Sequence, residues 1–299
     1  MQTPTVSVHM PVYNAQRYVA EAVESILGQT FTDFEFIILD DGSTDGSPAI
    51  LRRYAAEDGR IRLVSRPNAG VGKTRNECLA MARGEYFAVM DADDVSLPER
   101  FARQVAYLND TPDCVAVGSR VLLIDPDGDP IREWAYFASH EEIDEAHMAG
   151  KSGAIIHPSA MIRREAMVAA GGYWLEPAED YDLFLRLAER GQLANVPEML
   201  LKYRQHLGSF GYAQRMRQWQ GAQLALQEAH RRRGLDKPTH YAGPDIQHTF
   251  TSDHHRKWAW WALGAGNVAT ARKHAWTAVR KSPFSPKSWR VAACAVRGR

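Results

Sequence analysis

The sequence predicts an α/β protein that has a doubly wound sheet and a C-terminal helical extension. Over the first 110 of its 299 residues, short apolar runs alternate with segments whose apolar residues recur at helical spacing. From residue 213 onward Gln, Ala, Arg and Trp dominate, and the pattern is helical. We therefore expect one large α/β body followed by a helical appendix.

The first 110 residues are expected to form most of a parallel sheet. The apolar run Phe34–Leu39 is continuous, as is typical of a parallel strand that is buried on both faces. Further strands are expected at 6–10, 61–65 and 86–90. Helices are expected after Asn14, which is placed to cap the first one, around Ile50 and Leu51, over 75–82, and after Pro98.

Residues 111–212 have a mixed pattern that extends the same body. A strand is expected at 115–124, before a turn at 125–128. Helices are expected at 164–170 and 181–190, each of which ends at glycine. This segment predicts an α+β continuation of the sheet.

The C-terminal 87 residues contain one recognisable spacing. Ala259, Ala271, Ala275, Ala278 and Pro283 match the small-residue and proline positions of one tetratricopeptide unit. A stacked array needs about three such repeats. The spacing therefore predicts a single helical hairpin.

The formal net charge of zero hides an asymmetry. Residues 1–212 hold 20 Lys/Arg and 32 Asp/Glu, whereas residues 213–299 hold 16 Lys/Arg and 4 Asp/Glu, so the two parts carry net −12 and +12. The acidic body argues against a wholly basic nucleic-acid binder. Three cysteines fit neither a disulfide framework nor a metal motif.

Nothing in the sequence predicts a membrane-spanning helix. There is no run of about 18 apolar residues and no signal-peptide pattern at the N-terminus. We expect a cytoplasmic protein, either soluble or peripheral on the inner face of the plasma membrane. For the basic part, which holds six of the eight Trp, three explanations stay open: helix packing with a solvated basic face, an anionic lipid surface, and nucleic acid.

Three acidic clusters follow predicted strands or open a predicted helix. They are Asp40–Asp41, Asp91–Asp94, and Glu179–Asp180 with Asp182. Ligands of open α/β sheets bind beyond the carboxyl ends of the strands. Grouped carboxylates repel one another unless they share a cation, so a divalent metal that bridges a diphosphate would explain them. A single cluster, such as the one with Asp45, could equally be a helix cap.

The segment Gly70–Thr74 resembles the end of a phosphate-binding P-loop. The full motif requires glycine at position 67, where this chain has Pro67. Proline has no N–H and restricts φ, so a complete backbone cradle is not expected. Lys73 and Arg75 remain candidates to meet phosphates through their side chains, or they form an exposed basic helix start.

Several motifs together resemble a known family. The chain contains, in order, PVYNA (11–15), DDGSTD (40–45), RPNAGVGKTRN (66–76), GEYFAVMDADD (84–94), GGY (171–173), EDYDLFLRL (179–187) and YRQH (203–206). Residues 5–210 resemble family 2 glycosyltransferases, the inverting, metal-dependent nucleotide-sugar enzymes of GT-A fold. The resemblance implies that residues 1–110 bind the nucleotide sugar and residues 111–212 bind the acceptor and carry the base. It does not extend to the basic, Trp-rich residues 213–299.

The resemblance also implies roles for single residues. Pro11, Tyr13 and Asp41 would hold the base and ribose, and Asp91 and Asp93 would face the donor. Arg66, Lys73 and Arg75, in the motif between them, would also bind the nucleotide sugar. Asp180 would be the general base, with its neighbour Glu179 the less favoured choice.

The metal of such an enzyme would be Mn²⁺ or Mg²⁺. The resemblance implies Asp93 or Asp94 as its ligand, with a register uncertain by one residue, and His206 to complete the metal or diphosphate site. The metal would stabilise the departing diphosphate, so no protein general acid is needed. The implied donor is a nucleotide sugar, with UDP the favoured nucleotide, and the implied acceptor is a glycan or lipid-linked glycan of a bacterial surface polysaccharide or lipopolysaccharide.

Two other functions stay open. One is a P-loop-like NTPase, and the other is a non-catalytic sugar-nucleotide or glycan-binding module. No nucleic acid is expected as a partner. His157 would either line the acceptor side or be structural, and His254, His255 and His274 are expected to be ordinary surface or packing residues.

Overall fold

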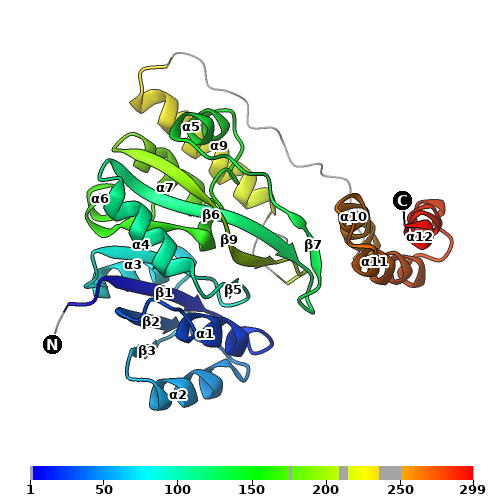
Figure 1. Cartoon of the computed structure of the whole chain (residues 1–299), viewed down its shortest axis with the longest axis horizontal. Coiled ribbons are helices and arrows are strands. Elements are labelled where there is room, and N and C mark those ends of the chain that lie inside the picture. Colours follow the sequence, from blue (N-terminus) through cyan, green and yellow to red (C-terminus); the bar gives the residue numbers. More distant parts are fainter. Residues whose placement is uncertain (1–2, 175–176, 209–214, 236–250, 299) are drawn as a thin grey trace. The chain divides into compact units, whose positions relative to one another are not determined.

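The computed structural model describes residues 3–174, 177–208, 215–235 and 251–298 (Figure 1). The strands are β1 Val6–Val12, β2 Phe34–Asp40, β3 Ile61–Ser65, β4 Tyr86–Val89, β5 Val95–Ser96, β6 Cys114–Ile124, β7 Pro130–Glu133, β8 Met161–Arg163 and β9 Gln192–Arg204. The helices are α1 Val19–Leu27, α2 Ser47–Glu57, α3 Val71–Met81, α4 Arg100–Asp110, α5 His140–Met148, α6 Arg164–Ala169, α7 Glu179–Ala188, α9 Arg215–Arg232, α10 Thr251–Gly264, α11 Val268–Lys281 and α12 Pro286–Arg297.

Among the described residues the strands form one sheet, in the order β3-β2-β1-β4-β8-β6-β9-β5, with β7 beside β6. Strands β1, β2, β3 and β4 pair in parallel, as Figure 1 lets the reader follow for the first three. All seven residues of β2 are buried, as its continuous apolar run predicts. Strand β8 pairs antiparallel with both β4 and β6. The predicted α/β class is confirmed.

The expected cap of the first helix is wrong. Helix α1 begins at Val19, five residues after Asn14, and Asn14 has a left-handed φ of 51°. Its Oδ1 atom instead accepts a hydrogen bond of 2.8 Å from the backbone N–H of Thr44. Asparagine tolerates this backbone conformation better than most residues do. Asn14 therefore ties the loop after β1 to the loop after β2.

The contacts divide the chain into two compact units. The first consists of the described residues within Met1–Val121, Ala135–Leu201 and Met216–Ala242. The second consists of those within Leu122–Trp134, Lys202–Arg215 and Gly243–Arg299. No helix of the described ranges is long and apolar enough to cross a bilayer.

Helix α9 belongs to the first unit, although the sequence places it in the extension from 213 onward. Its small residues Ala222, Ala225 and Ala229 are buried against Tyr181 and Leu185 of α7. Ion pairs from Arg232 to Glu189 and from Arg233 to Asp144 flank this contact. Alanines let two helix backbones approach closely. Composition alone does not show whether an alanine-rich helix is packed in this way or lies in solvent.

The second unit joins helices α10–α12 to the hairpin of β6 and β7. The predicted helical hairpin is present as α10 and α11, and Ala259, Ala271 and Ala275 are fully buried in it. Helix α12 adds a third helix. The core of this unit also takes in Leu123 and Ile131 of the β hairpin together with Trp258.

An acidic turn between β6 and β7 binds α11 through one lysine. The Nζ atom of Lys273 lies 2.6, 2.7 and 2.6 Å from carboxylate oxygens of Asp125, Asp127 and Asp129. Buried His274 lies 3.0 Å from Asp125 and 3.0 Å from His255. His274 is thus a packing residue, as expected, but it contacts a carboxylate cluster that is remote in sequence.

Candidate functional site

The candidate site residues of the first unit lie at the carboxyl ends of its parallel strands. Tyr13 follows β1 and is 55% exposed. Asp41 follows β2, and Asp91 follows the strand β4. Because these strands are parallel neighbours, the three loops emerge at one edge of the sheet. An exposed aromatic ring at this end of the sheet is suited to stack on a planar base.

The Asp41 carboxylate holds the loop that leads into α3. It accepts hydrogen bonds from the backbone N–H groups of Ala69 (2.9 Å) and Gly70 (3.1 Å) and pairs with the guanidinium of Arg66. The Arg66 guanidinium also donates to Glu77 and Thr74. A carboxylate has about four acceptor positions, so Asp41 keeps one for a further donor.

The same contacts argue against a P-loop. A P-loop presents its backbone N–H groups to phosphate oxygens. Here the N–H groups of Ala69 and Gly70 donate to Asp41 instead. Together with Pro67, this leaves the loop without a complete phosphate cradle.

Arg75 brings the second and third acidic clusters together. Its guanidinium forms an ion pair with Glu179 at the start of α7 and lies 3.1 Å from Asp91 after β4. The side chains of Arg75 and Glu179 are 8% and 6% exposed. Burial alone would lower the pKa of Arg75, but the carboxylates of Glu179 and Asp91 raise it above its ordinary value. Arg75 is therefore a fixed cation that does not point into solvent.

Glu179 and Asp180 are adjacent in sequence but differ in environment. Glu179 is buried in its ion pair with Arg75, whereas Asp180 is partly exposed at the start of α7. Burial nevertheless raises the pKa of Asp180 above its ordinary value, and the nearby Arg75 offsets this only in part. Asp182, the third acid of this motif, forms a buried ion pair with Arg186 within α7 and is structural.

The segment after β4 places its acids at different depths. Asp91 and Asp93 are partly exposed, whereas Asp94 is 1% exposed and lies in the field of buried Arg100. Burial raises the pKa of Asp91, and Asp93 raises it further against the opposing effect of Arg75. Two carboxylates that disfavour each other's charge leave a demand for a further cation.

Carboxylate oxygens fit a hard divalent cation. Within the described part of the chain, no three His, Cys, Asp or Glu side chains are gathered as a ready-made metal site. Mg²⁺ is commonly held by one or two carboxylates plus substrate phosphates, which needs no such protein cage. His206 belongs to the second unit, so its place in this site stays a prediction.

The sequence missed a buried aromatic and histidine layer beside Arg75. His9 of β1 stacks on Phe87 at 4.3 Å, and neither of its ring nitrogens has a hydrogen-bond partner among the described residues. His157 Nε2 lies 2.9 Å from the hydroxyl of Tyr173. Burial lowers the pKa of both histidines well below the ordinary value, and Arg75 adds to this. His157 is therefore buried, which agrees with the structural role that was one of its two expected roles.

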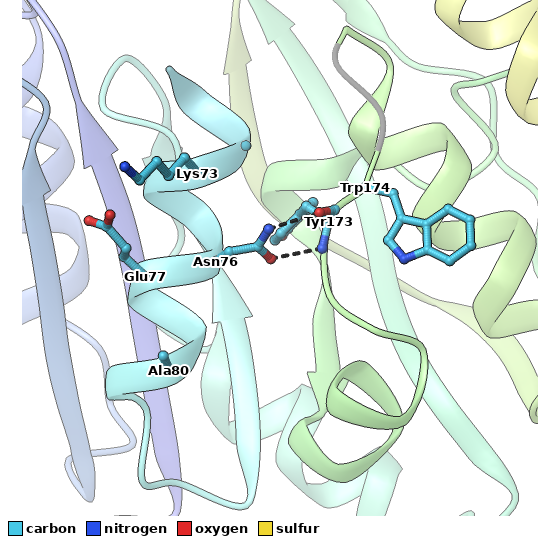
Figure 2. A pocket seen from close by; sticks show the side chains of 7 residues that line it. Lys73, Asn76, Glu77, Ala80, Tyr173 and Trp174 are labelled. Atoms are coloured by element: carbon cyan, nitrogen blue, oxygen red, sulfur yellow. Dashed lines mark hydrogen bonds between the residues drawn. The ribbon is translucent and has the colours of Figure 1, made fainter. Parts of the chain in front are cut away.

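A cavity of about 560 Å³ opens between α3 and the turn at residues 171–174. Its lining includes Lys73, Asn76, Glu77, Tyr173 and Trp174, which Figure 2 shows. The Asn76 amide closes one wall, because it donates to the carbonyl of Tyr173 (2.8 Å) and accepts from its N–H (2.9 Å). Lys73 lines the cavity and is exposed, but its side chain points away from Trp174 in Figure 2, whereas Arg75 is buried.

Relatives in sequence have a consistent description. The chain is 36% identical over 214 residues to the putative glycosyltransferase EpsE of Bacillus subtilis (strain 168), a match that covers 69% of this chain and 75% of the relative. It is 32% identical over 206 residues to the O-antigen biosynthesis glycosyltransferase WbnJ of Escherichia coli, covering 67% of this chain and 80% of the relative.

Solved structures support the fold. A mannosyltransferase from Pyrobaculum calidifontis, in complex with GDP-Man and Mn²⁺, has a TM-score of 0.60 at 21% identity and covers 99% of this chain and 81% of that one. TarS residues 1–349 of S. aureus, in complex with UDP-GlcNAc, has a TM-score of 0.61 at 16% identity and covers 98% and 92%. These likenesses confirm the GT-A fold.

The family model described as "Glycosyl transferase family 2" matches residues 7–169. The match covers more than half of the chain and includes most of the acidic site described above. The match includes the loops that hold Asp41 and Asp91 and the helix α3 that holds Arg75, while α7 follows it. The chain therefore belongs to glycosyl transferase family 2.

Proposed function

We propose that the chain is an inverting glycosyltransferase that moves a sugar from a nucleotide diphosphate-sugar to an acceptor hydroxyl. The observation that carries this proposal is the contrast at the start of α7. Glu179 is neutralised by Arg75, while the adjacent Asp180 keeps a partly exposed carboxylate whose pKa burial raises. A raised pKa brings a carboxylate closer to the value at which a general base works best near neutral pH.

In this proposal Asp180 accepts the proton of the acceptor hydroxyl. The acceptor oxygen forms a bond to the anomeric carbon while the bond from that carbon to the diphosphate oxygen, on the opposite face, breaks. A single displacement of this kind inverts the configuration. Arg75 holds Glu179 away from this reaction and is a positioning residue, since it lies between Glu179 and Asp91.

The donor would lie over the carboxyl ends of β1 and β2. The exposed ring of Tyr13 would stack on the base beside Pro11, and the acceptor position that Asp41 keeps would bind a base N–H. Arg66 would act through Asp41, which it holds in place. Lys73 stays a candidate for a direct charge on the donor because it is exposed.

Asp93 and Asp94 would hold Mn²⁺ or Mg²⁺, with Asp91 facing the donor and His206 the further candidate. The metal would supply Lewis-acid stabilisation of the departing diphosphate. The support from this chain is that the carboxylates of Asp91 and Asp93, which are both partly exposed, repel each other. The Mn²⁺ in the mannosyltransferase complex supports the same choice.

The biological setting we propose is synthesis of a bacterial surface polysaccharide or lipopolysaccharide glycan, with a glycan or lipid-linked acceptor. The O-antigen relative supports this setting. UDP-sugars are the first donors to test and GDP-mannose the second, because the two compared complexes contain one of each kind.

The test is a donor screen on the full chain with Mn²⁺, followed by two variants of the same motif. We expect Asp180→Asn to lower the turnover number by about 10²–10⁴-fold while nucleotide affinity stays within twofold, because only the proton acceptor is lost. Glu179→Gln is the matched control and should keep more activity. Wild-type turnover in Asp180→Asn would contradict the base assignment, and stabilisation by ATP but by no nucleotide sugar would contradict the transferase.

A further inference from the structure

The last 46 residues of the chain contain no acidic side chain. Residues 254–299 hold ten Lys/Arg and no Asp or Glu. No side chain of these residues can therefore neutralise their Lys and Arg. Any compensating negative charge must come from elsewhere in the chain or from a partner.

Several of these cations are already engaged. Lys273 binds the acidic turn at 125–129. Arg272 donates to the carbonyls of Ala295 and Val296 at the end of α12, and Arg256 pairs with Asp253. These residues hold the second unit together and do not require a partner.

Four other cations have no such role. Arg280, Lys281, Lys287 and Arg290 are exposed, and none forms an ion pair with an acidic side chain in the described ranges. They lie at the end of α11 and in the first turns of α12, around the connection at 282–285. Unpaired charges gathered at one helix–helix corner indicate a site for an anionic partner.

Exposed aromatic rings lie at the same corner. Phe284 in the connection is 97% exposed, and Trp276 and Trp289 are 43% and 50% exposed. The two Trp rings meet edge to face at 6.3 Å, and the indole N–H of Trp289 donates to the carbonyl of Pro283, next to Phe284. The three rings and four cations form what we call the 276–290 surface.

The combination favours a lipid surface over a nucleic acid. Interfacial segments pair Lys/Arg with Trp and Phe, whose rings enter the headgroup region while the charges meet anionic lipids. Bases stack on rings held in a groove that follows the strand, whereas Phe284 stands almost wholly in solvent at a connection between helices. A nearly bare Phe between two prolines is placed to insert into a bilayer interface.

We propose that the 276–290 surface docks the protein on an anionic phospholipid bilayer, with Phe284 as the inserted side chain and Arg280, Lys281, Lys287 and Arg290 as the headgroup contacts. This goes beyond sugar transfer, because it concerns binding alone and needs neither donor nor metal. It assigns the basic extension a partner and selects four of the ten cations in residues 254–299 for that role.

The test is flotation of the full chain with vesicles of phosphatidylcholine alone or with about 30% phosphatidylglycerol. We expect recovery on the anionic vesicles only, and loss of it as salt rises. Replacing all four cations by Gln should lower partitioning at least about tenfold, since each contributes measurably near an anionic surface. Phe284→Ser should lower it about threefold or more.

Matched controls lie on the first unit. Val168→Ser removes a 56%-exposed apolar side chain from α6, and Arg52→Gln removes an exposed charge from α2. Neither should change recovery. Phe284→Ser should also keep the thermal unfolding midpoint of the wild type, because its ring is exposed.

Two results would overturn the proposal. One is equal recovery of the fourfold Gln variant and the wild type on anionic vesicles. The other is vesicle binding that ignores Phe284→Ser while a single-stranded RNA of about 30 nucleotides competes it away, which would assign the surface to nucleic acid. Donor turnover is measured separately, so either result leaves the transferase proposal intact.

Discussion

Each unit of this protein contains a carboxylate cluster around one cation, but the two clusters are balanced differently. In the first unit Arg75 is shared by Glu179 and Asp91, with Asp180 nearby, and burial raises the pKa of both Asp91 and Asp180. In the second unit Lys273 contacts three aspartates at 2.6–2.7 Å.

The direction of the pKa shifts separates the two clusters. Although burial favours the protonated form of Asp125, hydrogen bonds from His274 and Lys273 hold its pKa well below the ordinary value. A lowered carboxyl pKa marks a cluster whose charge is already satisfied, whereas raised values mark one that retains a demand for protons or cations. We infer that the second cluster is structural and the first is functional.

The effect that would break this comparison most directly concerns the metal. Asp93→Asn and Asp94→Asn should each weaken Mn²⁺-dependent nucleotide binding by about tenfold or more, because a hard cation loses a charged oxygen ligand. Isothermal titration with UDP or GDP, with and without Mn²⁺, measures this. Asp127→Asn in the second unit is the control. Unchanged nucleotide affinity in both Asp93 and Asp94 variants would contradict the metal assignment.

The next effect concerns Arg75. Arg75→Met should destabilise the first unit by about 3–5 kcal/mol, because it removes the guanidinium that pairs with the buried carboxylate of Glu179. The double variant Arg75→Met with Glu179→Leu should recover much of this loss. Chemical denaturation measures both. A single variant as stable as the wild type would show that the pair contributes little.

A smaller effect is expected at Lys273, whose side chain is 33% exposed. Lys273→Met should destabilise the second unit by about 1 kcal/mol, since solvent screens part of the lost attraction. Hydrogen exchange of α11 and α12 should accelerate while that of α7 stays unchanged. Equal acceleration in both units would mean that the acidic turn does not stabilise the second unit specifically.

The smallest effect is a pH response. Because the pKa of Asp125 is lowered in the folded state, its stabilising contribution is present above the ordinary carboxyl value of about 4 and is lost as pH falls through the lower folded value. Exchange protection of α11 should therefore decline below about pH 4, and less so in Lys273→Met. A wild-type decline that begins well above pH 5 would have another cause.

The sequence predicted the fold class and the bounds of the strands well, because a continuous apolar run such as Phe34–Leu39 is typical of a buried parallel strand. It also placed Asp41 and Asp91 at the same end of the sheet, because parallel strands end there, whereas Asp180 comes near them through Arg75 at the start of α7. It mistook the cap at Asn14, whose side chain binds a loop 30 residues away. Local patterns carry no information about such a contact.

The charge pairing was not predictable from the sequence. Arg75 and Glu179 are 104 residues apart, and nothing local shows that one neutralises the other. Asp125 and Lys273 are likewise far apart in the sequence. Their ion pair joins charges that the sequence alone shows only as separate acidic and basic excesses. His9 looks like an ordinary strand residue, and its burial with no hydrogen-bond partner among the residues that the structure describes appears only in three dimensions.

The measurement that tests the central claim most directly is the pH dependence of sugar transfer at saturating donor. If Asp180 is the base, the rate should fall on the acidic side of a single pKa above the ordinary carboxyl value of about 4, because a protonated carboxyl cannot accept the acceptor proton. Asp180→Asn should lose this limb together with most of the rate, and Glu179→Gln should keep it. An unchanged acidic limb in Asp180→Asn, at wild-type turnover, would contradict the account.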